Sequence, residues 1–206
     1  ERIKEEELFE ILESMEQQFL YLYQSYVPKY RQSNWGVLQT TSILQNAAWF
    51  GECFCLEEMK QIAEWAKDEL LDQLESQIYG DGSHWEQSMM YHIEVLNSVT
   101  TMLVFRKRAG VVTPKRAEEI LYGMYDYVMH AAGPDHLQIA QGDSDVTDIR
   151  DVMTRGAMLF EESAFKYAGY EEPDLESIWC FGMEQKEQYL KLKSKQPEIL
   201  NGLYTC

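Results

Sequence analysis

The chain has 206 residues, of which 45% are hydrophobic and 26% charged, the composition of an ordinary globular protein able to form a core. Its formal charge of −17 argues against nucleic acid and against an anionic membrane surface, because both attract clusters of Lys and Arg. The same charge disfavours a heavily sulfated ligand. No stretch is apolar enough for a membrane span, and the N-terminus lacks the pattern of a signal peptide.

The cysteines do not have the spacing of a metal site. They are Cys53, Cys55, Cys180 and Cys206. We expect buried or idle thiols rather than disulfides, which favours a reducing compartment such as the cytoplasm and leaves the periplasm and secretion open. The chain begins inside a helical pattern and ends without an evident stop signal, so we expect it to be part of a longer protein.

Apolar residues recur at helical spacing almost throughout, and no segment alternates as a strand would, so the predicted fold is all-α. A first helix is predicted over 5–31, where Pro28 should kink or end it. A second helix starts after Ser33 or Asn34, since either residue makes a good N-cap, and it runs towards Cys55. A third is predicted over 56–78.

A break follows at 79–82, and the pattern Ser83-x-x-Glu86 then has the form of a capping box that opens a fourth helix to about Lys107. The later predicted segments are a helix from Thr113-Pro114, an irregular connection over 131–145, a helix over 146–167, and one or two short helices that end before Pro197. Mostly short connections predict antiparallel neighbours, in a single helical domain over 1–206.

Residues 79–92, YGDGSHWEQSMMYH, gather polar, aromatic and ionisable side chains around a glycine turn and a predicted helix start. On that helix His84, Ser88 and Tyr91 would share a face, and Gln87 precedes Tyr91 by four residues. A phenol, an imidazole and an amide at a helix N-terminus are able to form a catalytic surface that meets an anion. The competing interpretation makes Tyr91 a core residue and places His84 and His92 on the surface.

An ordered set of motifs spans nearly the whole chain. Asn34-Trp35 is followed after about fifty residues by DGSxxExSxxYH over 81–92, and later by GDSD over 142–145. This set resembles the heparinase II/III family of polysaccharide lyases. The resemblance implies an incomplete α/α toroid of antiparallel helical hairpins, and a β-sandwich domain that would follow it outside this chain. It also implies an acidic polysaccharide or oligosaccharide substrate that contains uronic acid and is cleaved by β-elimination without a cofactor.

By this resemblance Tyr91 protonates the departing glycosidic oxygen and is able also to abstract the sugar proton, while Asn34 neutralises the uronate carboxyl group. A nearby carboxylate such as Asp81 would keep the phenol protonated. A role as helix cap competes for Asn34. The expected substrate-binding residues are Trp35, Gln39, His84, Trp85, Glu86, Gln87 and His92.

The chain departs from the family at two points. Gln39 is neutral in a segment where several members carry an acidic residue or a histidine. The family's general base is a histidine. The two downstream candidates are His130 and His136, and neither lies in a matching motif. We therefore expect the true base to lie beyond this chain.

Carboxylates suggest further interpretations. Asp143 and Asp145 are too few ligands for a hard cation, so a turn or cap role is expected and no metal site. A glycoside hydrolase on a similar toroid would need two catalytic carboxylates, which Asp81, Glu86 and Asp143 are able to supply. A third interpretation is a non-catalytic helical module that binds glycan or protein.

Overall fold

The computed structural model describes residues 3–111 and 113–197, and over these residues the protein is all-α, which confirms the predicted fold class. The chain divides into two compact units, residues 1–73 and 74–206. Closure of the helices into an incomplete toroid, and a single domain over 1–206, stay predictions. In the described part of the chain no helix combines the length and apolarity needed to cross a bilayer.

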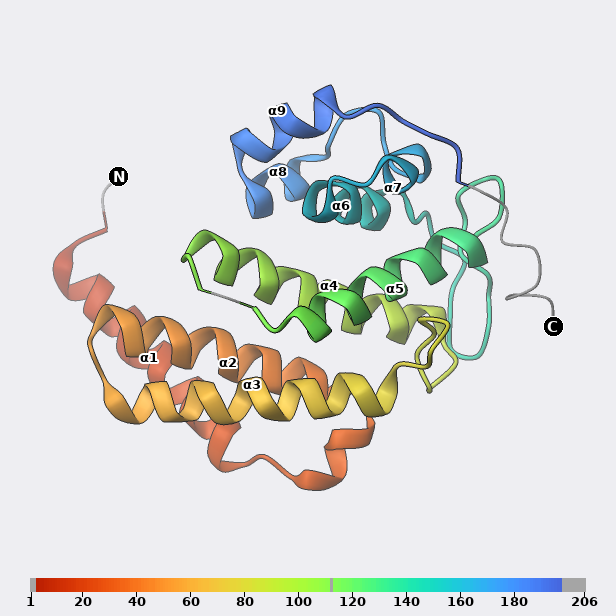
Figure 1. Cartoon of the computed structure of the whole chain (residues 1–206). Helices are drawn as coiled ribbons and strands as arrows, with labels where there is room; N and C mark the ends of the chain where they lie inside the picture. The colour runs from red at the N-terminus through yellow and green to blue at the C-terminus, as the bar shows by residue number, and fades with distance from the viewer. Residues whose placement is uncertain (1–2, 112, 198–206) are drawn as a thin grey trace. The chain divides into compact units, whose positions relative to one another are not determined.

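The first unit is built from long helices packed in antiparallel fashion. Its elements are α1 (Glu5–Gln24), η1 (Pro28–Gln32), α2 (Asn34–Cys53) and most of α3 (Glu57–Gln77). A three-residue connection over 54–56 joins α2 to α3, and the two helices run side by side (Figure 1). Phe19 of α1 is buried against Phe50 of α2, with the ring centroids 5.3 Å apart.

The predicted first helix over 5–31 is too long. α1 ends at Gln24, and the 3-10 helix η1 begins at Pro28. Val27, the residue before the proline, is extended with φ −115° and ψ 118°. A residue that precedes proline is pushed out of the helical region by contact with the proline ring, so the helix stops before Pro28 rather than kinking there.

The start of α2 was predicted closely. Ser33 occupies the N-cap with an extended backbone, and Asn34 is the first helical residue. Gly36 follows in the first turn, where a Cβ atom would lie 2.1 Å from the carbonyl oxygen of Tyr30. Only glycine therefore lets η1 lie directly against the beginning of α2.

The second unit holds two long and four shorter helices among the described residues, packed around α6. Its helices are α4 (Met89–Arg108), α5 (Lys115–Ala131), α6 (Arg150–Phe160), α7 (Ser163–Ala168), α8 (Leu175–Phe181) and α9 (Met183–Lys191). α6 packs against the other five helices, and α4 and α5 lie side by side (Figure 1). Gly156 faces the ring of the fully buried Tyr125, where a Cβ atom would come within 2.6 Å.

The helix predicted over 146–167 is shorter and interrupted. It begins at Arg150 and stops at Phe160, because Glu161 adopts a left-handed backbone with φ 53°. Glu162 then caps α7, its carboxylate accepting the backbone N–H of Ala164 at 3.1 Å. Nothing in the sequence marks Glu161 as a helix end, since the left-handed region usually selects glycine or asparagine.

The described cysteines are unpaired. Cys53 and Cys55 are exposed, and Cys180 is half-buried. Cys206 lies outside the described residues.

Candidate functional site

The site prediction centres on the first turn of α4. Ser88 is the N-cap of this helix, and its hydroxyl oxygen accepts the backbone N–H of Tyr91 at 3.5 Å. Tyr91 is thus fixed in the first turn, where backbone N–H groups and the helix dipole favour negative charge nearby. The Ser83-x-x-Glu86 motif, which was predicted to start this helix, lies just before it and is not helical.

The predicted capping box of Ser83 and Glu86 is wrong. The Asp81 carboxylate accepts the backbone N–H of Ser83 at 3.0 Å and its hydroxyl at 2.7 Å, which makes a tight turn instead of a cap. Gln87 has a positive φ of 52°, so the chain is not helical before Met89. His84 and Gln87 therefore do not share a helical face with Tyr91.

His84 is buried rather than exposed. Its Nε2 lies 2.9 Å from the side-chain oxygen of Gln77, and its Nδ1 accepts the backbone N–H of Glu86 at 3.3 Å. These partners require a neutral ring with the proton on Nε2. Burial lowers the pKa of His84, which favours the same neutral form.

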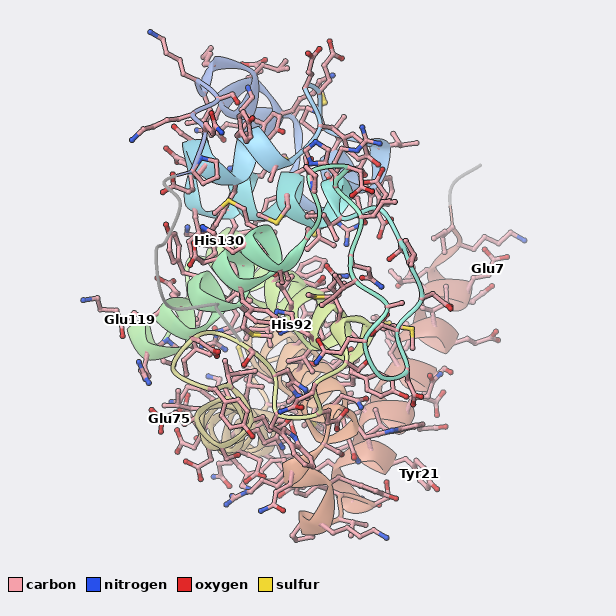
Figure 2. All side chains as sticks on the ribbon, turned by 90° about the vertical axis from the view of Figure 1, so that its right-hand side faces the viewer. Glu7, Tyr21, Glu75, His92, Glu119 and His130 are labelled. Carbon is pink, nitrogen blue, oxygen red and sulfur yellow. The ribbon has the colours of Figure 1, made fainter. Side chains whose placement is uncertain are left out.

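His92 is also buried, so the competing interpretation that placed both histidines on the surface is wrong. Its Nε2 donates to the carbonyl oxygen of Met124 at 3.1 Å, and its ring packs against Tyr127 at 5.3 Å between centroids. Burial lowers the pKa of His92 to about 3. Figure 2 shows His92 among the inner side chains of its unit, whereas Glu119 projects at the edge. A direct role for either imidazole in glycan binding stays a prediction.

The Tyr91 hydroxyl points to a residue from a distant part of the chain. It donates to the carboxylate of Asp143, 52 positions later, at 2.9 Å. This hydrogen bond and the negative charge of Asp143 raise the pKa of Tyr91, with a smaller contribution from Glu86. The sequence prediction of a carboxylate that keeps the phenol protonated was correct in kind, but it named Asp81, whose carboxylate instead binds Ser83.

The connection over 132–149 carries Asp143 and is anchored to the start of α4 directly after it. Ser144 is buried, and its hydroxyl oxygen lies 3.0 Å from that of Ser88 and accepts the backbone N–H of Met90 at 3.1 Å. Gly142 has a φ of 61°, and a Cβ atom there would lie 3.4 Å from the carbonyl oxygen of Gln87. The GDSD motif thus fastens this connection to the start of α4.

The turn that precedes Tyr91 contacts α5 and the end of α3. Gly82 has a φ of 86°, and a Cβ atom at this position would lie 2.1 Å from the carbonyl oxygen of Gly123 in α5. Trp85 donates its backbone N–H to the carbonyl oxygen of Gln77 at 2.9 Å, while 40% of the residue stays exposed. The turn before Tyr91 is therefore held by backbone contacts, whereas the connection that carries Asp143 is held by the Ser144 hydroxyl.

The other predicted residues belong to the first unit. Asn34 is buried, with 9% exposed, while its neighbour Trp35 is 71% exposed. Ser33 occupies the N-cap position, so the competing prediction that Asn34 is the N-cap is wrong. The amide of Gln39 donates to the carbonyl oxygen of Leu22 at 2.7 Å and so links α2 to the end of α1. That Asn34 and Tyr91 act on one sugar stays a prediction.

The remaining candidates for a base or a metal lie as follows. His130 donates from Nδ1 to the carbonyl oxygen of Asp126 at 2.8 Å, within α5. His136 lies in the connection over 132–149 with a φ of 62°. Among the residues that the structure describes, no group of three or more His, Cys, Asp or Glu side chains is arranged to hold a metal ion.

Comparison with known families decides the relationship. Residues 1–167 match the family model described as the heparinase II/III N-terminus. The chain belongs to this family. No curated protein and no solved structure matches it.

Membership of the heparinase II/III N-terminal family confirms the relationship inferred from the motifs. The matched range includes the Asn34, Tyr91 and Asp143 segments, and ends before α8 and α9. The family is one of polysaccharide lyases, which places the protein in that broad enzyme class. The roles of individual residues do not follow from the match.

Proposed function

We propose that the protein acts as a polysaccharide lyase on uronic-acid-containing glycans, with Tyr91 as the general acid. The observation that carries the proposal is the phenol in the first turn of α4, held against a carboxylate that keeps it protonated. A protonated phenol near neutral pH is the form that an acid catalyst needs. The family relationship supports the choice of an acidic polysaccharide as substrate.

In the proposed reaction a general base removes the proton from the carbon next to the uronate carboxylate. The electron pair of that C–H bond forms the new carbon–carbon double bond, and the bond from the next carbon to the glycosidic oxygen breaks. Tyr91 transfers its hydroxyl proton to this oxygen, so the leaving sugar departs as a neutral alcohol. The phenolate that remains regains a proton from solvent.

Asn34 is proposed to neutralise the uronate carboxylate. The charge on this group increases as the neighbouring proton is removed, and a fixed amide donor stabilises the increase without carrying a charge of its own. Two features support the proposal: the residue is 9% exposed, and it lies in the first turn of α2. Backbone N–H groups at such a turn also favour an anion.

The exposed aromatic residues are proposed to contact sugar rings. Trp35 is 71% exposed and Trp85 is 40% exposed, so neither residue belongs to the core. A tryptophan face stacks well on the apolar face of a sugar, and each lies next to a proposed catalytic segment. The proposed binding role of Glu86 and Gln87 rests on the same proximity to Tyr91 along the chain.

The test is incubation of the full-length protein with polymers rich in uronate, while ultraviolet absorbance and new reducing ends are recorded together. Elimination produces both signals, because its unsaturated product absorbs, whereas hydrolysis produces reducing ends alone. We expect Tyr91→Phe to lower kcat by about 10²- to 10⁴-fold with an unchanged circular dichroism spectrum. Full activity of this variant would refute the proposal, and reducing ends without absorbance would favour a hydrolase.

A further inference from the structure

Asp143 is joined to the proposed acid by a hydrogen bond that the sequence does not suggest. The Tyr91 hydroxyl donates to a carboxylate oxygen of Asp143 at 2.9 Å, and the two residues come from α4 and from the connection over 132–149. Asp143 itself is exposed. An exposed pair of this kind contributes little to stability, so its interest lies in its effect on the phenol.

The position of Asp143 is set mainly by the residue that follows it. Ser144 is buried, and its hydroxyl oxygen accepts the backbone N–H of Met90, in the same turn as Tyr91. Gly142, on the other side, is exposed and has a left-handed φ of 61°, and a Cβ atom there would make ordinary contact with the carbonyl oxygen of Gln87. Asp143 is therefore held over the first turn of α4 by the Ser144 anchor, where its carboxylate reaches the phenol.

The charged groups that act on the Tyr91 phenol are both acidic. Asp143 comes from the connection over 132–149, and Glu86 comes from the segment before α4. On α4 itself the next carboxylate is Glu94, one turn further along. A phenolate at this position would face negative charge from two directions, whereas a neutral phenol gains a charge-assisted hydrogen bond.

We propose that Asp143 is a positioning residue that orients the Tyr91 hydroxyl and disfavours its ionised form in the resting enzyme. This inference rests on the proposed function of Tyr91. It adds to that function the residue that holds the acid, which the family resemblance does not name. Asp143 orients the phenol because the hydroxyl hydrogen must point along one direction to reach its carboxylate.

The proton inventory follows from this assignment. In the resting state the proton lies on the Tyr91 oxygen and is shared with Asp143 through the hydrogen bond. During elimination that proton moves to the glycosidic oxygen as the carbon–oxygen bond breaks. The proton from the sugar carbon goes to the general base, and a solvent proton then restores the phenol.

The direct test measures the pKa of Tyr91 by an NMR titration. The protein carries ¹³C at the tyrosine ring carbon that bears the hydroxyl. Tyr91→Phe identifies the resonance. In Asp143→Asn, which keeps a hydrogen-bond acceptor but removes the charge, we expect the pKa of Tyr91 to fall towards its ordinary value. Asp143→Glu keeps the charge and should hold the pKa high.

The matched control is Asp145→Asn, which removes the same charge two residues further along the same connection. It should change the pKa of Tyr91 much less than Asp143→Asn does. Equal effects of the two variants, or none from Asp143→Asn, would overturn the inference, because the phenol would then respond only to the overall charge or not at all.

The second test is the pH profile of kcat. An acid catalyst loses activity as pH rises through its pKa, so the alkaline limb of Asp143→Asn should move to lower pH than in the natural protein. Asp143→Ala, which also removes the acceptor, should lower kcat further, by about tenfold to a hundredfold. An unchanged alkaline limb would count against the inference.

The two proposals fail in different ways. If Tyr91→Phe keeps full activity, the proposed function is wrong, yet the NMR titration still reports whether Asp143 controls the phenol. If Tyr91→Phe is inactive and Asp143→Asn leaves both the titration and the alkaline limb unchanged, only the role of Asp143 is wrong.

Discussion

Acidification is expected to destabilise the second unit through His92. Burial lowers the pKa of this imidazole from its ordinary value of 6.5 to about 3 in the folded protein. Between these values the unfolded chain binds a proton that the folded chain excludes, so stability is present above pH 6.5 and is lost as the pH falls. Each pH unit in this window costs about 1.4 kcal/mol.

The magnitude follows from the two pKa values. Between pH 7 and pH 4.5, His92 alone should remove about 2–3 kcal/mol from the free energy of unfolding, a large part of a typical total of about 5–15 kcal/mol. The assay is urea denaturation at pH 7, 5.5 and 4.5, followed by circular dichroism. His92→Gln is the informative variant, because its amide is able to donate to the Met124 carbonyl but does not titrate.

Other titrating groups also lower the free energy of unfolding in acid. Their contributions cancel when the natural protein is compared with the variant at the same pH. The difference in unfolding free energy between the natural protein and His92→Gln should shrink by about 2–3 kcal/mol from pH 7 to pH 4.5. His136→Gln, which alters a half-buried histidine of the same unit, serves as the control for a simple loss of histidine. A constant difference across this range would refute the reasoning.

Four further variants, one of them a control, test the packing and the binding surface. Gly82→Ala should lower the free energy of unfolding by at least about 2 kcal/mol, because its Cβ overlaps the Gly123 carbonyl. Gly80→Ala, with open space around it, should change the same quantity by about 0.5 kcal/mol or less, and equal effects in urea denaturation would contradict this. Ser144→Ala should cost about 1–2 kcal/mol and speed hydrogen exchange of the backbone amide it binds in α4; unchanged exchange would mean that another group anchors the connection. Trp35→Ala should raise KM for a uronate polymer by up to about tenfold and leave the urea midpoint unchanged, and an unaltered KM would remove this residue from the binding surface.

Helical periodicity predicted the fold class and most helices because each helix buries one face against a neighbour. α3, for example, was predicted within one residue at each end, since its apolar stripe is regular from Met59 to Leu74. Periodicity does not report the backbone dihedral angle of a single residue. The stop at Glu161 and the positive φ of Gln87 were missed for this reason.

The capping box was misread because two turn motifs overlap. Ser83 is followed by Glu86 at the right spacing, but it is also preceded by Asp81, whose side chain competes for the same backbone N–H groups. The serine that caps α4 is Ser88, and the glutamate spacing does not identify it. Local spacing alone cannot choose between two serines when each has an acidic or polar partner nearby.

The surroundings of Tyr91 were predicted in part. The resemblance pointed to Tyr91, and the glycine turn before it was recognised, but the example given for the carboxylate that keeps the phenol protonated was Asp81. The actual partner, Asp143, is 52 positions away, and only the tertiary fold brings it close. The GDSD motif was the available signal, and it was interpreted as a turn because two carboxylates are too few to bind a metal.

The order of residues in this motif limits how the protein can be redesigned. Ser144 is buried and binds the start of α4, and Asp143 before it reaches the phenol. Inserting one amino acid between these two residues would shift the carboxylate relative to its anchor, whereas an exposed position such as Ile139 or Ala140 lies ahead of the motif. Loop grafts between relatives should therefore be joined before Gly142, so that the motif is exchanged as one unbroken piece.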